Sequence, residues 1–148
     1  MYERIGDLLR SGRAIVFVTP SSTVQETVQL MDQHNVGSVL VLDDKTELCG
    51  IFTERDLVKR VVSKNIDPAT TLMDDVMTRD VAVVDARTRA TDVFHLMDTK
   101  KCRHIPVADG KQILGVVSLR DILRKDRSLK ELEIIQMRSY FLDPTYPA

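Results

Sequence analysis

The sequence predicts an α+β protein made of two copies of one β-α-β-β-α unit, and an internal repeat is the main observation behind this prediction. Residues 50–57 (Gly-Ile-Phe-Thr-Glu-Arg-Asp-Leu) recur as residues 115–122 (Gly-Val-Val-Ser-Leu-Arg-Asp-Ile). Upstream, the Leu-Met-Asp of residues 30–32 recurs at residues 96–98. The length of 148 residues suits two small halves that bury surface against each other, because an isolated half would be marginally stable.

The first repeat is expected to span residues 1–64, and its first half follows from local patterns. Residues 3–10 predict a short helix, and the β-branched run at residues 15–18 (Ile-Val-Phe-Val) predicts a buried strand. The Pro-Ser-Ser-Thr of residues 20–23 supplies a side-chain oxygen with which a helix can begin. Residues at helical spacing then predict a face packed against a sheet, formed by Val24, Thr27, Val28 and Met31.

The second half of this repeat predicts a hairpin and a closing helix. Residues 37–42 and 48–52 predict two strands, which are joined by the polar turn of residues 43–47. The helix after Thr53 is expected to face the core with Leu57, Val58, Val61 and Val62.

The second repeat, residues 72–126, is expected to follow the same order. Residues 81–84 predict a strand, and the next helix has an apolar face of Ala90, Val93, Phe94 and Met97. Residues 104–108 and 112–118 predict a hairpin, because the Asp-Gly of residues 109–110 is a strong turn signal. The closing helix from residue 119 is expected to bury Ile122 and Leu123.

Three further segments connect or extend the repeats. Residues 65–71 predict a polar linker, and residues 72–77 predict a short helix that matches residues 5–9. Residues 127–148 predict a C-terminal helix and tail, which have no counterpart in the first repeat. This helix is only partly amphipathic, so it either packs on the chain's own core or contacts a second chain.

Composition argues against several classes of partner. The net charge of −1 predicts no long-range attraction to nucleic acid or to an anionic membrane. No apolar run approaches the roughly 18 residues of a membrane span, and the charged start of the chain lacks signal-peptide features. Cys49 and Cys102 have no nearby cysteine partner and are expected to be reduced thiols. We therefore expect a cytoplasmic protein.

The repeated segment permits two interpretations. Thr53 with Asp56, and Ser118 with Asp121, place a hydroxyl at a helix start and a carboxylate three residues later. This pattern forms a capping box, with Asp in place of the usual Glu. The same groups also suit a nucleotide, because a helix start binds phosphate and a carboxylate accepts hydrogen bonds from ribose hydroxyls. The residues alone leave both interpretations open.

Together, these segments resemble a tandem cystathionine β-synthase (CBS) domain pair, also called a Bateman module. The resemblance covers residues 5–123 and rests on the two Gly-apolar-x-Thr/Ser-x-x-Asp segments, the two Leu-Met helices and the Arg-His-Ile-Pro-Val of residues 103–107. It implies two repeats related by pseudo-twofold symmetry, with their small sheets packed together and clefts between them. It also implies a homodimer and adenosine-containing ligands such as AMP, ADP, ATP, S-adenosylmethionine or NAD.

The resemblance further implies roles for individual residues, with each cleft built from both repeats. Asp56 and Asp121 would bind ribose. The phosphate would be bound by Thr53, Ser118, Arg103 and His104. The adenine pocket would be formed by Val36, Gly37, Ile51, Cys102 and Val116, and the glycines of the repeated segment, Gly50 and Gly115, would allow its close approach. His104 has an alternative role as an ordinary hydrogen-bonding residue at a strand edge.

The two clefts are expected to differ in their affinity for phosphate. Asp56 and Thr53 would face Arg103, whereas Asp121 and Ser118 would face Gly37, which has no charge. The cleft with Asp56 and Arg103 is therefore better equipped for an anion.

The leading hypothesis is a regulatory module that binds an adenine nucleotide and transmits this to an unknown regulated protein. The alternative is a structural or interaction protein with empty clefts, which dimerises and docks onto an enzyme or transporter. Enzymatic activity is not expected. Neither a catalytic triad nor a catalytic cofactor is indicated, and His34, His95 and His104 lack metal-ligand spacing.

Overall fold

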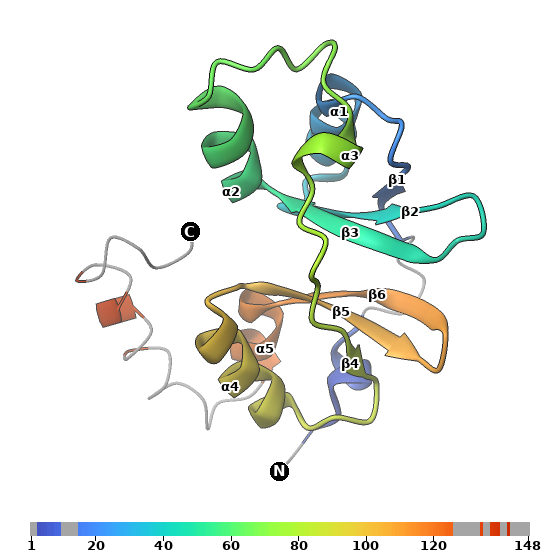
Figure 1. Cartoon of the computed structure of the whole chain (residues 1–148). Coiled ribbons are helices and arrows are strands. Elements are labelled where there is room, and N and C mark those ends of the chain that lie inside the picture. Colours follow the sequence, from blue (N-terminus) through green and yellow to red (C-terminus); the bar gives the residue numbers. More distant parts are fainter. Residues whose placement is uncertain (1–2, 10–14, 126–133, 135–136, 140–141, 143–148) are drawn as a thin grey trace. The chain divides into compact units, whose positions relative to one another are not determined.

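The computed structural model describes residues 3–9, 15–125, 134, 137–139 and 142 (Figure 1). The chain divides into two compact units, one formed by Ala14–Val81 and the other by Met1–Arg13 together with Ala82–Ala148. Each unit has a three-stranded mixed sheet, which confirms the predicted α+β fold of two similar repeats.

The unit Ala14–Val81 contains the order β1-β2-β3. Strand β2 (Ser38–Leu42) lies between β1 (Phe17–Val18), which is parallel to it, and β3 (Leu48–Thr53), which is antiparallel. The helical elements are α1 (Val24–His34), α2 (Glu54–Asp56), the π-helical turn η2 (Leu57–Val62) and α3 (Met73–Val76). Helix α1 begins at Thr23, which forms a capping box with Glu26, as the Ser-Thr pattern predicted.

The second unit repeats this architecture with the order β4-β5-β6. Strand β5 (His104–Asp109) is parallel to β4 (Val84–Asp85) and antiparallel to β6 (Gln112–Ser118). The helical elements are the 3₁₀ turn η1 (Ile5–Leu8), α4 (Ala90–Lys100) and α5 (Leu119–Lys125). The predicted hairpin turn is confirmed, because Gly110 has a φ of 61°, in the left-handed region that favours glycine.

Each unit has its own hydrophobic core. In the first unit, α1, β2, β3, η2 and α3 contribute, with Val24, Val39, Phe52, Val61 and Met73 fully buried. In the second, η1, α4, β5, β6 and α5 contribute, with Ile5, Val93, Val107, Val117 and Ile122 fully buried. Burial of these apolar side chains is the main source of stability for each unit.

The short helices that lead into each repeat pack against the other repeat. Ile5 N–H donates to the Thr88 carbonyl at 2.7 Å, so η1 belongs to the second unit although it precedes the first repeat. Met73 N–H donates to the Ser22 carbonyl at 2.8 Å, so α3 belongs to the first unit. The bounds 1–64 and 72–126 for the two repeats stay predictions. The compact units have different bounds, because each unit includes the short helix that precedes the other repeat.

Two predicted strands are shorter than the sequence indicated. Residues 15–18 contribute only β1 and residues 81–84 only the first residue of β4. Phe17, which was expected to be buried, is 47% exposed, and Val83, which precedes β4, is 44% exposed. Phe17 and Val18 are neighbours in β1 and point to opposite faces of the sheet, so only Val18 faces the core.

The inner face of the helix after Thr53 is also narrower than predicted. Val58 is 59% exposed and Val62 is 61% exposed, while Val61 is fully buried and Leu57 packs against the core. Leu57 and Val61 are four residues apart and share a face, and their direct neighbours in sequence are turned away from it.

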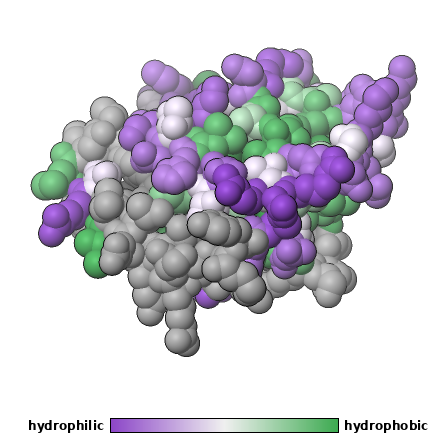
Figure 2. Space-filling model, turned by 90° about the horizontal axis from the view of Figure 1, so that it is seen from below, coloured by the Kyte–Doolittle hydropathy of each residue, from purple (hydrophilic) through white to green (hydrophobic). Residues whose placement is uncertain are grey.

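The surface carries several exposed apolar side chains. Figure 2 shows one face, on which hydrophobic side chains gather in a green area bordered by purple hydrophilic ones. Within the described residues, no helix has the length and apolar character needed to cross a membrane. Most of the predicted C-terminal helix and tail, residues 127–148, lies outside the described residues.

We predict that Gly50→Ala destabilises the protein by about 1–3 kcal/mol, because overpacking forces backbone shifts. A Cβ atom on Gly50 would lie 2.6 Å from the Thr78 carbonyl oxygen and 2.9 Å from Met77 Sδ. Urea unfolding would measure the change, with Val58→Ala at an exposed position as the control. An unchanged urea midpoint for Gly50→Ala would show that strand β3 at Gly50 is not in close contact with residues 77–78.

Candidate functional site

The first candidate site lies where β3 ends and α2 begins. The Thr53 N–H and hydroxyl donate to Asp56 Oδ2 at 3.0 and 3.2 Å, and the Asp56 N–H donates to Thr53 Oγ1 at 3.3 Å. Thr53 and Asp56 therefore form the reciprocal capping box that the sequence predicted. The Asp56 residue is 9% exposed.

The other oxygen of Asp56 is engaged as well. Thr78 Oγ1 donates to Asp56 Oδ1 at 3.5 Å, and Arg60 Nε lies 3.6 Å from the same oxygen in an ion pair. A carboxylate has roughly four acceptor positions. Both oxygens of Asp56 are therefore engaged by the protein itself.

The second candidate site lies where β6 ends and α5 begins. The Ser118 N–H donates to Asp121 Oδ2 at 2.9 Å, and the Asp121 N–H donates to Ser118 Oγ at 3.2 Å. The capping interpretation is therefore confirmed in both repeats. Asp121 is half-buried, and its Oδ1 accepts no hydrogen bond from the described residues. Within the part of the chain that the structure describes, the side chain of Asp121 accepts only the bond from the Ser118 N–H.

Each helix start lies beside the start of the middle strand of its own unit. His104 pairs with Ser118 in the ladder, and Ser38 pairs with Thr53. The first helical N–H of α5 donates to the Arg103 carbonyl at 2.8 Å, and that of α2 donates to the Gly37 carbonyl at 3.1 Å. The structure thus brings Arg103 and His104 together with Ser118 and Asp121. The predicted crosswise pairing of groups from both repeats stays a prediction.

The residues predicted to line the adenine pocket occupy two kinds of position. Ile51 is 6% exposed and lies inside β3, and Val116 is half-buried in β6. Val36 and Cys102 are half-buried, and each follows the end of a helix, where its N–H donates to a helix carbonyl at 3.0 Å. These residues flank the two helix starts, but their role in binding stays a prediction.

The two glycines lie against other segments of the chain, and their predicted role beside adenine stays a prediction. The space beside Gly50 is occupied by the Thr78 carbonyl and by Met77, and Leu9 lies 3.3 Å from the position of a Cβ atom on Gly115. Both glycines therefore allow a close approach of the chain itself. The pattern of the sequence could not show this, since Thr78 and Leu9 come from segments outside the repeated motif.

Electrostatics distinguish the two residues at the start of β5. Burial lowers the pKa of His104 below its ordinary value of 6.5, while Asp121 opposes this shift and Arg103 adds to it. His104 is therefore neutral near pH 7 and offers a hydrogen bond, whereas the Arg103 guanidinium is permanently charged. Burial also raises the pKa of the Cys49 and Cys102 thiols, so both are protonated and weakly reactive.

Two residues of the first site escaped the sequence analysis, namely Arg60 and Thr78. The spacing of four residues between Asp56 and Arg60 is a signal for a helical ion pair and could have identified Arg60. No local signal places Thr78, which reaches Asp56 only through the folding of α3 onto β3.

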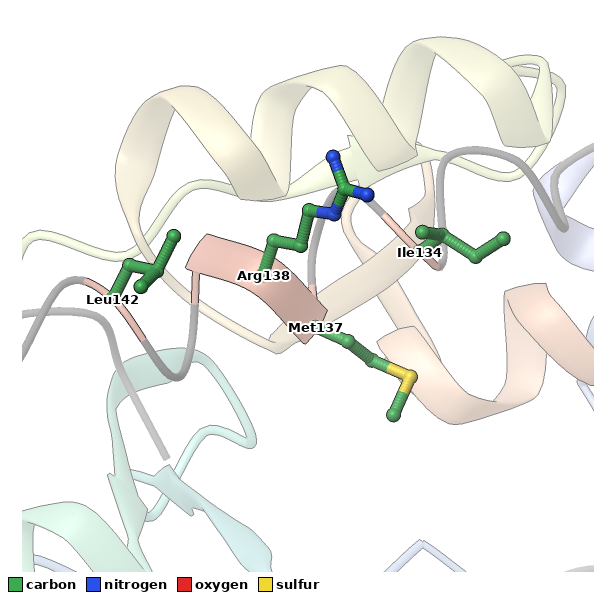
Figure 3. Close-up of a pocket in the computed structure, with 4 residues that line it drawn as sticks. All are labelled: Ile134, Met137, Arg138 and Leu142. Carbon is green, nitrogen blue, oxygen red and sulfur yellow. The ribbon is translucent and has the colours of Figure 1, made fainter.

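A pocket elsewhere in the second unit has a volume of about 500 Å³ (Figure 3). It is lined by Ile134, Met137, Arg138 and Leu142. None of the predicted site residues lines it. Among the described residues, no cluster of three histidine, cysteine or acidic side chains is arranged to hold a metal ion.

Comparison with known proteins identifies the repeats. The CBS domain model matches residues 5–63 and 73–128. An uncharacterized protein of Methanopyrus kandleri is 33% identical over 121 residues, which are 81% of this chain and 61% of that protein. Arabinose 5-phosphate isomerase of Yersinia pestis is 35% identical over 121 residues, which are 82% of this chain and 37% of the isomerase. The chain thus spans less than two thirds of these relatives.

A solved structure shares the fold. It is that of a protein with CBS domains from Burkholderia ambifaria, with a TM-score of 0.79 and 28% identity. The match covers 85% of this chain and 95% of that one.

We predict that the stability of the protein decreases as the pH falls below about 6.5, the ordinary pKa of histidine. The unfolded chain then binds a proton at His104 that the folded state disfavours, so the proton stabilises the unfolded state. Urea unfolding at several pH values would measure this decrease. His104→Gln should reduce the slope of the unfolding free energy against pH. His34→Gln, on an exposed residue of α1, is the control. An identical slope in wild type and His104→Gln would contradict the prediction.

Proposed function

The chain belongs to the CBS-domain family, and from this premise we propose that it is a regulatory module that binds adenine nucleotides. The observation that carries the proposal is the duplicated helix start, in which a hydroxyl and a carboxylate hold the same geometry in both units. Such duplication suits a sensor with paired sites. The ligand class comprises AMP, ADP and ATP, or NAD or S-adenosylmethionine.

The ribose is assigned to the two carboxylates. Asp121 has the better geometry for this role, because its Oδ1 accepts no hydrogen bond from the described residues and the residue is half-buried. A sugar diol needs two acceptor positions close together, and a carboxylate supplies them. Asp56 fills the same role once its Oδ1 is released by its present partners.

The phosphate is assigned to the hydroxyls and to the start of β5. Ser118 and Thr53 each stand at a helix start, where unpaired amides and the helix dipole favour an anion. Arg103 adds a permanent charge, and neutral His104 adds a hydrogen bond. The adenine ring is assigned to the apolar residues flanking these groups, Val36, Gly37, Ile51, Cys102 and Val116.

The clefts are proposed to lie between the repeats, with Asp56 and Thr53 facing Arg103, and Asp121 and Ser118 facing Gly37. This arrangement makes the first cleft the more positive one and the better binder of phosphate groups. Ligand binding regulates a partner only if the ligand favours one packing of the repeats, or of two chains in a homodimer. The regulated target is proposed to be a protein, and nucleic acid and membrane are not among the proposed partners.

The share of each relative that this chain matches favours an accessory role for the chain over a catalytic one. The match to the isomerase of Yersinia pestis covers only 37% of that enzyme. The match to the Burkholderia ambifaria protein covers 95% of a chain that carries CBS domains. The shared part therefore corresponds to a module that accompanies an enzyme in one relative and makes up nearly the whole chain in another.

The second candidate function is an interaction protein with empty clefts. The observation that favours it is that both oxygens of Asp56 are engaged by the protein itself. In this alternative, the carboxylates stabilise helix starts and nothing else. Binding to a partner would then be indifferent to nucleotide.

We predict that the protein binds at least one of AMP, ATP, NAD and S-adenosylmethionine, and that Asp121→Asn weakens binding by about tenfold. The asparagine side chain retains one acceptor for the Ser118 N–H but loses the charge, and hydrogen bonds to charged groups contribute about 1.5–3 kcal/mol. Isothermal titration calorimetry with millimolar ligand would measure this. Asp98→Asn, on an exposed residue of α4, is the control. Absence of binding by wild type with all four ligands would refute the proposed function.

A further inference from the structure

Arg60 joins the first candidate site to a distant segment of the chain. Its Nε forms the ion pair with Asp56 Oδ1, while its Nη1 donates to the carbonyls of Val76 and Met77 at 3.1 and 3.0 Å. One guanidinium thus holds both the ribose-binding carboxylate and the end of α3. Thr78 makes a second link, because its hydroxyl donates to the same oxygen of Asp56 at 3.5 Å.

Residues 76–78 are also fixed to strand β3. The N–H of Ile51 donates to the Thr78 carbonyl, and the N–H of Thr78 donates to the Ile51 carbonyl, both at 2.9 Å. The absence of a side chain at Gly50 lets the Thr78 carbonyl approach this closely. Directly after this segment, residues 79–83 lead from one compact unit to the other, and Figure 1 follows the chain from α3 to β4.

The second repeat lacks this arrangement in the described residues. Among the described residues, Asp121 contacts Ser118 through Oδ2, and its Oδ1 accepts no hydrogen bond. Within this part of the chain, the two carboxylates have the same sequence motif and different partners. The carboxylate of Asp56 must break its contacts with Arg60 and Thr78 before a sugar can occupy both of its oxygens.

We propose that Arg60 determines the affinity of the Asp56 site, by acting with Thr78 as a latch that competes with the ribose for Asp56 Oδ1. This inference rests on the proposed function, because it concerns the same ribose-binding carboxylate. A nucleotide that takes Oδ1 displaces Arg60 and Thr78. It thereby weakens the hold on residues 76–78, which precede the connection to the second unit.

The latch gives the first site a different role from the second. Part of the ligand's binding energy is used to open the latch, so the observed affinity is lower than the contacts alone would allow. The charge of Arg103, in the cleft proposed above, provides the additional attraction that such opening requires. Because Arg60 and Thr78 link Asp56 to residues 76–78, occupancy at Asp56 is coupled to the connecting segment.

The first test measures affinity at the Asp56 site while binding at Asp121 is weakened. In the Asp121→Asn background, Arg60→Gln should tighten AMP and ATP binding by about three- to fivefold, because a partly exposed ion pair four residues apart is weak. Arg87→Gln, which removes the exposed pair of Arg87 with Asp85, is the matched control and should leave affinity unchanged. Equal or weaker binding by Arg60→Gln would overturn the proposal, since Arg60 would then be inert or a direct ligand of the phosphate.

The second test examines the latch without ligand and then with it. Hydrogen–deuterium exchange of the full chain should show faster exchange of the Ile51 and Thr78 amides in Arg60→Gln than in wild type or Arg87→Gln. Millimolar AMP or ATP should have the same effect on wild type. Unchanged exchange in Arg60→Gln would overturn the latch even if nucleotides bind. Faster exchange in Arg60→Gln, with no binding of any nucleotide, would show that Arg60 holds residues 76–78 in place, but it would refute the proposed function and the competition with ribose.

Discussion

The reciprocal bonding of a hydroxyl and a carboxylate at each strand-to-helix junction is the constraint on which the rest of the structure depends. At Thr53 and Asp56, and again at Ser118 and Asp121, it satisfies amides that the helix cannot satisfy itself. The next helical amide bonds to the carbonyl that precedes the middle strand. Hairpin, helix and middle strand therefore meet at one point, and polar groups needed for capping remain close to the surface.

The same junction shows that the two similar motifs have different partners among the described residues. In the first unit, the segment after α3 folds back onto β3 and brings Thr78 to the carboxylate, while Arg60 reaches it from η2. In the second unit, the carboxylate is engaged through one oxygen only among the described residues. Capping and ligand binding are compatible there, because capping uses a minority of the acceptor positions. The chemistry of each site is thus set by what packs beside the motif.

The exchange of leading segments links the two repeats through the chain. Turn η1 completes the core of the second unit, and α3 completes that of the first. Each unit is therefore assembled from pieces that are not contiguous in the repeat to which they belong by sequence. A substitution in η1 therefore affects the stability of the second unit, and a substitution in α3 affects the stability of the first.

The sequence by itself determined the repeat, the hairpins, the capping boxes and the buried faces of α1 and α4, because each of these depends on contacts between residues a few positions apart. It overestimated the lengths of β1 and β4 and the width of the buried face of η2. These quantities depend on which residues of a strand or helix meet the core, and local patterns do not fix that. Only the tertiary structure decided that Gly50 faces Thr78 and that Arg60 and Thr78 occupy Asp56. These contacts join segments brought together by core packing, and no periodicity or spacing encodes them.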